Sequence, residues 1–219
     1  MDNEIILIDK PKDMTSFGVV ARIRRVLSQE EGKKVKVGHT GTLDPFATGL
    51  LILLTGKMTK KSNEFLKLDK EYEAEICLGK VSTTGDPEGE ISESYHGKAP
   101  SREEVERTVN GFIGEIEQRA PAFSAVKIKG RRAYDLARKG VEVEMPTRRV
   151  KIYEIEILGS EYPKLKIRTK VSSGTYIRTL GEDIGKALWT GAYVKELRRT
   201  RIDRYKVEDA ISLDEFMNK

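Results

Sequence analysis

The chain has 219 residues, of which 38% are hydrophobic and 34% charged, and a net charge of +5. This length allows one large domain with a sizeable core, and the longest apolar run, residues 50–54, is too short to cross a membrane. The only cysteine, Cys77, excludes a disulfide framework and a cysteine-based zinc site. Because the start is acidic and lacks an apolar stretch of signal-peptide length, we expect a cytoplasmic protein.

The predicted elements mix strands and helices along the whole chain. Their type follows from the spacing of apolar residues and from turn residues at their ends. Strands that come in pairs and alternate with helices predict an α+β fold, with a mixed, mainly antiparallel central sheet and flanking helices. In chain order the elements are strands at 4–8 and 71–79 with a helix between them that ends before Gly32, a helix after residue 101, strands at 150–158 and 164–171, a helix near 179–188, a strand at 201–207 and a short terminal helix.

Three of the predicted helices carry N-cap signals. Thr15 or Ser16 precedes the first one, and a hydroxyl there accepts a backbone N–H. Ser101 and Glu104 have the spacing of a capping box. Ser212 stands in the same position before the terminal helix. These signals place the helix starts more firmly than apolar spacing alone.

Charge is unevenly distributed along the chain. Residues 127–151 contain nine Lys/Arg and three Asp/Glu, and residues 195–206 contain six and two. Residues 82–117 have the opposite balance, with three basic and nine acidic residues. Solvated surface explains such runs in many proteins. A polyanionic partner is the other interpretation, because clustered cations gain free energy when phosphates release their counterions.

The stretch GHTGTLDPFATGLL, residues 38–51, places one carboxylate, Asp44, at a glycine-rich bend before an apolar run. Pro45 disfavours helix at Asp44, so Asp44 is predicted to be either the N-cap of a helix or an acid held in a turn. The glycine-rich region does not contain a phosphate-binding P-loop either. Gly56-Lys57 is followed by Met58, where that motif needs Ser or Thr. A zinc deaminase is excluded by the lack of H-x-E and C-x-x-C, and a glycosidase would need a partner carboxylate.

This stretch resembles the catalytic motif of the TruB family of pseudouridine synthases. The segments KPKDMTS, EYEAEICLG, APAFSAVKIKGRRAYDLARKG and VSSGTYIRTLGEDIG are similar to TruB segments and occur in the family's order, over roughly residues 5–205. The resemblance implies the pseudouridine synthase fold in a single catalytic domain over 1–219. It also implies an insertion at about 122–149 that closes over RNA like a thumb. We expect no PUA domain, since only 13 residues follow Lys206.

The resemblance further implies an isomerase that converts a uridine, U55 of the tRNA T-loop, to pseudouridine after the base is flipped out. Asp44 matches the family's catalytic aspartate, which either attacks C1′ of the ribose or removes a proton at C2′. Arg178 matches the arginine that pairs with this aspartate. Tyr72 matches the tyrosine that stacks on the target base and is proposed to help remove the C5 proton. No metal and no organic cofactor are implied.

The remaining candidates are RNA-binding residues. His39 matches a histidine that contacts the T-loop, and Lys60, Asp86 and Leu197 match positions near the family's active site. From local sequence alone Asp86 could equally cap a turn, and Leu197 could be a core residue. The cations of the insertion that we expect to face the RNA backbone are Lys127, Lys129, Arg131, Arg132, Arg148 and Arg149.

The partner implied is tRNA through its T-arm stem-loop. We expect a monomer with no obligate protein partner and no membrane contact. An alternative function is an RNA-binding or RNA-folding module that opens T-arms or other stem-loops independently of catalysis. Such a module would use the same basic surface but would not need Asp44.

Overall fold

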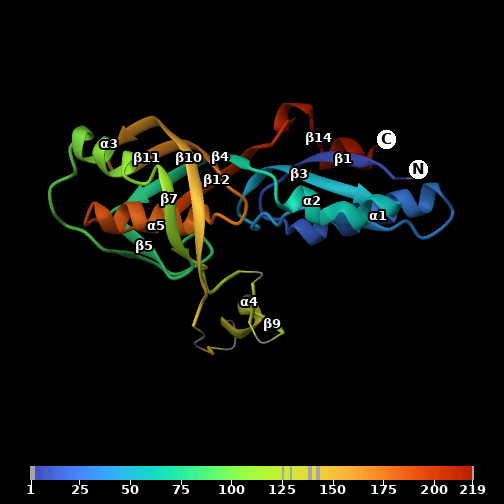
Figure 1. Cartoon of the computed structure of the whole chain (residues 1–219), viewed down its shortest axis with the longest axis horizontal. Coiled ribbons are helices and arrows are strands. Elements are labelled where there is room, and N and C mark those ends of the chain that lie inside the picture. Colours follow the sequence, from blue (N-terminus) through green and yellow to red (C-terminus); the bar gives the residue numbers. More distant parts are fainter. Residues whose placement is uncertain (1–2, 125, 129, 138–139, 142–143, 219) are drawn as a thin grey trace. The chain divides into compact units, whose positions relative to one another are not determined.

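The computed structural model describes residues 3–218 apart from 125, 129, 138, 139, 142 and 143, and leaves out the side chains of Lys127, Arg132 and Asp135 (Figure 1). The chain divides into two compact units. The first unit contains the residues up to Glu73 together with those from Leu197 onward, and the second unit contains Ala74–Glu196. Strands β4 and β12 contribute residues to both units.

The main sheet is mixed and mostly antiparallel, as the sequence predicts. Its strands follow the order β14-β1-β3-β12-β4-β11-β10-β7, with β2 beside β3 and β13 beside β12. The pairs β1–β14 and β3–β12 are parallel, whereas β1–β3, β2–β3, β10–β11 and β7–β10 are antiparallel. The strands are β1 (Ile5–Lys10), β2 (Val37–His39), β3 (Thr48–Thr55), β4 (Lys70–Leu78), β7 (Gly114–Arg119), β10 (Thr147–Glu161), β11 (Lys164–Val171), β12 (Ala192–Ile202), β13 (Tyr205–Lys206) and β14 (Ile211–Ser212).

Helices and two short hairpins complete the described part of the chain. The hairpins are β5 (Lys80–Ser82) with β6 (Ile91–Glu93), and β8 (Lys127–Ile128) with β9 (Arg131–Arg132). The helices are α1 (Ser16–Glu30), η1 (Gly56–Lys61), α2 (Ser62–Leu66), α3 (Arg102–Asn110), α4 (Ala133–Ala137), α5 (Ile177–Ala187), η2 (Val207–Asp209) and α6 (Leu213–Met217).

Strand β3 is the centre of the first unit, because it is buried on both faces. Successive strand residues point to opposite faces. Leu51 and Leu53 therefore pack in the cluster that includes the apolar face of α1, while Leu50, Ile52 and Leu54 pack in the cluster of Phe65. Each fully buried leucine contributes about 1.5–3 kcal/mol. The apolar run that follows Asp44 is therefore the anchor of the segment that carries it.

The predicted caps are confirmed at all three helices. Thr15 Oγ1 accepts the Gly18 N–H at 2.9 Å. The capping box of Ser101 and Glu104 is complete, and Ser212 accepts from the backbone N–H of Glu215. These helix starts were predictable because a cap is a local interaction that depends on residues three positions apart.

In the second unit, helices α3 and α5 pack with the sheet strands β7 and β10 (Figure 1). Helix α5 also lies close to β12 and β4, at Gly181. A Cβ at Gly181 would lie 2.7 Å from a methyl group of Val194 and 3.6 Å from Ile76. A glycine at this position thus permits the helix to lie directly on β-strand side chains.

The predicted insertion leaves the end of β7 and returns at the start of β10 (Figure 1). It contains the β8–β9 hairpin and α4. A small apolar cluster of Ala120, Ala133 and Met145 holds it together, with Tyr176 packed against it. The insertion therefore packs around a small core that it shares with Ala120 at its base and with Tyr176, the residue before α5.

One predicted strand is wrong in part. Residues 201–207 do not form a separate last strand, because Arg201 and Ile202 belong to the end of β12 and pair with Lys206 and Tyr205 of β13. Asp203, with φ of 51°, makes the turn between them. Asp is one of the few residues that tolerate this left-handed conformation. The alternation of RIDRYKV is typical of a strand, and the turn within it is not signalled by glycine or proline.

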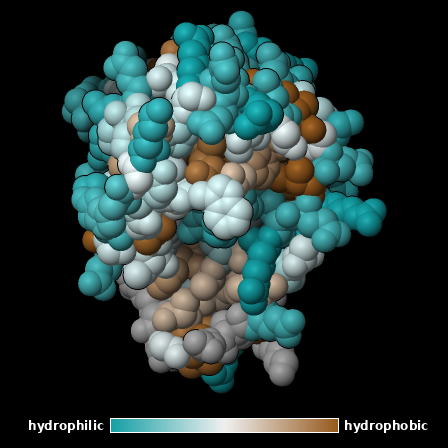
Figure 2. Space-filling model, turned by 90° about the vertical axis from the view of Figure 1, so that its left-hand side faces the viewer, coloured by the Kyte–Doolittle hydropathy of each residue, from teal (hydrophilic) through white to brown (hydrophobic). Residues whose placement is uncertain are grey.

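Hydrophilic side chains cover most of the surface around α3 and α5, with apolar residues scattered between them (Figure 2). Among the residues that the structure describes, the most exposed large apolar side chain is Trp189, at 86%. None of the described helices is both long enough and apolar enough to span a membrane.

Candidate active site

Asp44 lies in a tight turn between β2 and β3. Its carbonyl oxygen accepts the Ala47 N–H at 3.1 Å, and Pro45 occupies the second position of the turn, where its fixed φ is favoured. Strand β3 follows directly, so the interpretation of Asp44 as a helix N-cap is wrong. The side chain is partly exposed. Asp44 is therefore an acid held in a turn, the other of the two predictions.

Ser16 fastens the turn on one side of Asp44. Its hydroxyl donates to the Leu43 carbonyl at 3.0 Å and accepts the Leu43 N–H at 2.8 Å. Both groups are buried, and buried polar groups without partners are costly. The first residue of α1 thus fixes the backbone immediately before Asp44.

Lys10 fastens the other side. Its side chain is fully buried, and Nζ donates to the carbonyls of Pro11 and Met14 at 2.7 Å and of Pro45 at 3.1 Å. The Pro45 carbonyl also accepts the Asp13 N–H at 2.8 Å. A buried ammonium group needs such acceptors to offset its lost hydration. The last residue of β1 therefore fixes the backbone immediately after Asp44.

Arg199 of β12 donates hydrogen bonds to the backbone before and after the turn. It is 1% exposed, and it donates through Nε to the Leu50 carbonyl at 2.7 Å and through Nη2 to the Gly41 carbonyl at 3.2 Å. Gly49 has φ of 103°, and a Cβ there would overlap the backbone of Arg199. Glycine at position 49 is what permits β12 to pass this close to the turn.

The other predicted residues of the first unit differ in exposure. His39 is partly exposed, and its Nδ1 accepts the Gly41 N–H at a long 3.4 Å. Lys60 is exposed on η1. Tyr72 and Leu197 are mostly covered, at 9% and 8% exposure. The turn and the aromatic ring are thus positioned within the folded unit, while Lys60 reaches solvent.

Arg178, in the first turn of α5, is a buried cation of the second unit. It is 4% exposed, and its guanidinium donates to the carbonyls of Thr84 at 2.9 Å and Phe123 at 2.7 Å and to Asp86 Oδ2 at 3.0 Å. A cation near a helix N-terminus is unfavourable, so these acceptors are needed to hold it. Gln118 fixes the start of the helix, exchanging two hydrogen bonds with the backbone of Tyr176.

Asp86 combines the two interpretations that the sequence left open. Its carboxylate accepts the Glu88 N–H at 3.0 Å, which caps the turn, and it accepts the Thr84 hydroxyl at 2.5 Å. It also pairs with Arg178 while only 2% of its surface is exposed. This geometry gives Asp86 the role of positioning Arg178. Arg178 and Asp44 belong to different units, so their predicted pairing stays a prediction.

The predicted RNA-facing cations of the insertion are described in part. Arg131 is exposed, and Arg149 is exposed with a long 3.7 Å ion pair to Glu117. The Arg148 guanidinium lies over the Tyr176 ring, 5.3 Å from its centre. Lys129 lies outside the described residues, as do the side chains of Lys127 and Arg132.

In the second basic segment of the sequence, three of the six cations are held by acceptors of the protein itself. Arg199 is buried, Arg198 forms a two-pronged ion pair with Asp9, and Lys195 pairs with Glu75 at 2.8 Å. The hydrogen bond from Lys195, with a second from Lys166, holds the pKa of Glu75 below its usual range. These three cations therefore do not form a free polyanion patch, because Arg199 is bound to backbone carbonyls and the other two to carboxylates on strands distant in sequence.

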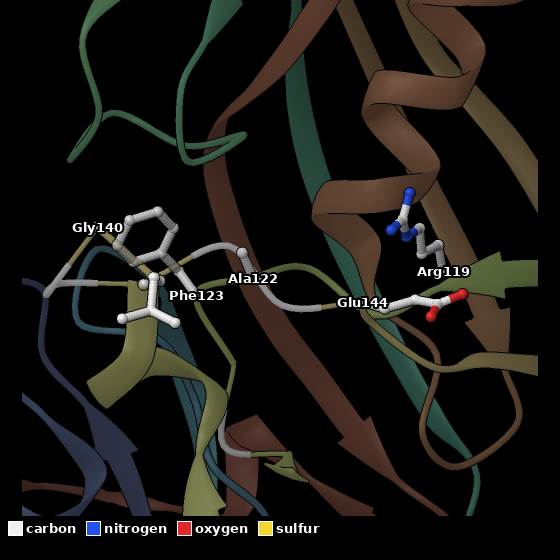
Figure 3. A pocket seen from close by; sticks show the side chains of 7 residues that line it. Arg119, Ala122, Phe123, Gly140 and Glu144 are labelled. Atoms are coloured by element: carbon white, nitrogen blue, oxygen red, sulfur yellow. The ribbon is translucent and has the colours of Figure 1, made fainter.

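A pocket of about 630 Å³ opens in the second unit between the end of β7 and the insertion (Figure 3). Arg119 and Glu144 lie on one side of it, and Phe123 and Gly140 lie on the other (Figure 3). The volume is within the range of small-molecule and cofactor sites. Since the carbonyl of Phe123 accepts from Arg178, the pocket is connected to that buried arginine. No three His, Cys, Asp or Glu side chains gather as a metal site within the described part of the chain.

Comparison with known proteins gives the family. The model of the TruB family pseudouridylate synthase (N-terminal domain) matches residues 24–177, and the tRNA pseudouridylate synthase B C-terminal domain matches residues 178–219. The chain belongs to the TruB family. It is therefore a pseudouridine synthase, an isomerase, and the fold expected from the sequence is confirmed.

Individual relatives cover nearly the whole chain. A tRNA pseudouridine synthase B of Phocaeicola vulgatus is 48% identical over 98% of this chain and 92% of its own length. One from Aquifex aeolicus is 46% identical over 97% of this chain and 73% of its own length. In a crystal structure of a Cbf5–Nop10–Gar1 complex, a chain with 35% identity superposes with a TM-score of 0.74, covering 98% of this chain and 53% of that one.

Sequence reasoning missed the residues that hold the Asp44 turn. Lys10 and Ser16 occur in the segment KPKDMTS, which was recognised as a whole without a role for either residue. Arg199 was counted as surface charge. Only the fold shows that they meet at the turn, because they come from β1, α1 and β12.

Proposed function

We propose that this TruB-family isomerase converts U55 in the T-loop of tRNA to pseudouridine, with Asp44 as the catalytic carboxylate. The observation that carries the proposal is the fastened turn: Ser16, Lys10 and Arg199 hold the backbone on both sides of Asp44. A reactive group gains most when its position is set before the substrate arrives. The relatives named tRNA pseudouridine synthase B support tRNA as the substrate.

The reaction rearranges bonds within one nucleotide. The bond from N1 of uracil to C1′ of the ribose breaks, the base turns, and C5 bonds to C1′. C5 then loses its proton and N1 gains one, so no electrons or groups enter or leave. Attack at C1′ and proton removal at C2′ both need the ionised form of Asp44. We accordingly assign no metal or organic cofactor, and we propose a monomeric, cytoplasmic enzyme.

The other residues take supporting roles in this proposal. Arg178, held by Asp86 and two carbonyls, pairs with Asp44 and orients it. Tyr72 contacts the target base and helps to remove the C5 proton, and Leu197 lies beside the active site. His39 and Lys60 contact the RNA near the loop. Arg178 is thus a positioning residue for Asp44, and Asp86 in turn positions Arg178.

The target base lies inside a folded loop, so flipping it out costs a few kcal/mol of stacking and pairing. Phosphate contacts offset this cost through counterion release. We assign these contacts to the cations of the insertion. A related chain, 32% identical with a TM-score of 0.71, comes from an H/ACA RNP bound to a substrate RNA containing 2′-deoxyuridine, which supports RNA binding by this fold.

The test is release of tritium from C5 of uridine in an unmodified tRNA transcript, without added cofactor. We expect release by the wild type, and a loss of at least about 100-fold in Asp44→Asn with RNA binding retained. Tight binding by the wild type without any release would contradict the proposal and favour the RNA-folding module. Release of free uracil would instead indicate a glycosidase.

A further inference from the structure

A second feature of the first unit is a pocket of about 380 Å³ where the segment after α1 passes η1. Its uncharged lining residues are Asn3, Val35, Gly56 and Thr59. The other lining residues are all lysines, so the charged groups of the pocket are all positive. They are Lys33, Lys34, Lys36, Lys57 and Lys60.

These lysines have few acidic neighbours. Lys33 has a long ion pair of 3.6 Å with Glu31, and no Asp or Glu is among the residues that line the pocket. All five lysines are exposed. Cations that converge on one hollow repel one another and concentrate anions from solution. The pocket is therefore suited to a ligand that carries negative charge.

Backbone hydrogen bonds connect the segments that carry the lysines. The Gly56 N–H donates to the Lys36 carbonyl at 2.8 Å, which ties the two lysine-bearing segments together. The Lys57 N–H donates to Asn3 Oδ1 at 2.6 Å, and the Thr59 hydroxyl donates to the Gly56 carbonyl at 2.8 Å. Gly56 has φ of 52°, which glycine adopts without strain. The hollow is thus formed by hydrogen-bonded backbone and does not need a ligand to shape it.

The pocket lies at the end of β3 opposite to the Asp44 turn, because η1 follows β3 and Asp44 precedes it. Lys36 directly precedes β2, and His39 at the end of β2 leads into the segment of Asp44. A strand rises about 3.3 Å per residue, so Lys36 lies about 10 Å from His39. Strand β3 (Thr48–Thr55) spans about 23 Å at this rise per residue. An RNA stem-loop that extends along β3 from a target uridine at Asp44 would therefore bring backbone phosphates to the lysines.

We propose that this lysine pocket, made of the five lysines named above, binds backbone phosphates of the RNA that carries the target uridine. The inference rests on the proposed function and adds Lys33, Lys34, Lys36 and Lys57 to the RNA contact already assigned to Lys60. No aromatic residue lines the pocket, and ammonium groups recognise phosphate without reading bases. Its contribution is therefore affinity that is independent of sequence and sensitive to salt.

The test compares two triple variants that each lower the net charge by three. The pocket variant is Lys34→Gln, Lys36→Gln and Lys57→Gln. The control variant is Lys80→Gln, Lys98→Gln and Lys186→Gln in the second unit, where Lys80 and Lys186 already pair with Glu93 and Asp183. Binding of an unmodified tRNA transcript is measured by fluorescence anisotropy over a range of salt concentrations, and tritium release is measured in parallel for the wild type.

In the pocket variant we expect the slope of log K against log salt to become flatter by about 2 to 3, and affinity near physiological salt to fall about 10- to 100-fold. The control variant should stay close to the wild type. Equal losses in the two variants would overturn the pocket while leaving the synthase proposal intact. A pocket-specific loss without tritium release by the wild type would support the pocket and contradict the synthase proposal.

Discussion

Arg178 and Asp86 form an ion pair whose N–O distance is 3.0 Å and in which neither side chain is more than 4% exposed. Each of them depends on the other, because a buried charge without its partner is strongly destabilising. Arg178 also donates to two backbone carbonyls. The pair thus joins the start of α5 to the turn at residues 84–88 and to the insertion.

Removing Asp86 should destabilise the protein severely. We expect Asp86→Ala to lower the free energy of unfolding by about 3–5 kcal/mol, since it leaves the Arg178 guanidinium buried and short of an anion. Urea denaturation measures this change. Glu93→Ala, which removes an exposed ion pair with Lys80, is the control and should cost no more than about 1 kcal/mol. Similar losses in the two variants would contradict a buried role for the Arg178–Asp86 pair.

Ser16→Ala should reduce both stability and activity. It removes two buried hydrogen bonds to Leu43, next to Asp44, and we expect a loss of about 1–3 kcal/mol. Thr15→Ala removes the exposed cap of the same helix and should cost about 1 kcal/mol. Urea denaturation and tritium release are measured for both. Only Ser16→Ala should lose activity under conditions where both proteins are folded, and equal activities would argue against control of the turn by Ser16.

Gly49→Ala should be poorly tolerated. The backbone at Gly49 is left-handed, and a methyl group there would overlap the backbone of Arg199. We expect a loss of stability greater than the cost of about 1–2 kcal/mol for the left-handed conformation alone. Gly32 also has a positive φ, of 62°, but has open space around it, so Gly32→Ala is the control. Thermal unfolding of both variants isolates the close approach of β12, and an identical shift in Tm would show that the approach is unimportant.

Stability should rise with pH above neutrality because of Lys70. This residue is 7% exposed, and burial, followed by the charge of Arg199, lowers the pKa of its ammonium group to about 8. Its Nζ donates to the carbonyls of Leu66 and Leu68. Below pH about 8 the folded and unfolded chains both hold the proton. Between about 8 and the ordinary value near 10.4, only the unfolded chain holds it, so raising the pH favours the folded state.

Urea denaturation at several pH values across this window tests the prediction for Lys70. The wild type should gain stability as the pH rises relative to Lys70→Met, which has no group to titrate at this position. If the difference in unfolding free energy between the two proteins does not change with pH, Lys70 keeps an ordinary pKa in the folded state.

The sequence was informative wherever a signal is local or belongs to a long ordered motif. The caps of α1, α3 and α6 depend on a few adjacent residues, and the family follows from several segments in one order. Contacts between distant segments were not predictable. Arg198 and Lys195 read as free cations because Asp9 and Glu75, their partners, lie on other strands.

The same limit hid the lysine pocket. Its lysines come from residues 33–36 and from 57–60, and neither group forms a long basic run in the sequence. Strand β3 pairs with β2 in antiparallel orientation, and this pairing brings the two groups together. Of this set only Lys60 was singled out from the sequence, through its resemblance to a family position.

The hydrogen bonds around the Asp44 turn determine when its conformational entropy is lost. Ordering a residue costs about 1–2 kcal/mol, and the anchors at Leu43, Pro45 and Gly41 impose this cost during folding. When RNA then binds, the turn loses no further conformational entropy, because the position of the Asp44 carboxylate is already set. A loosened turn would therefore slow each turnover through the fraction of time that Asp44 spends out of position, even with RNA fully bound.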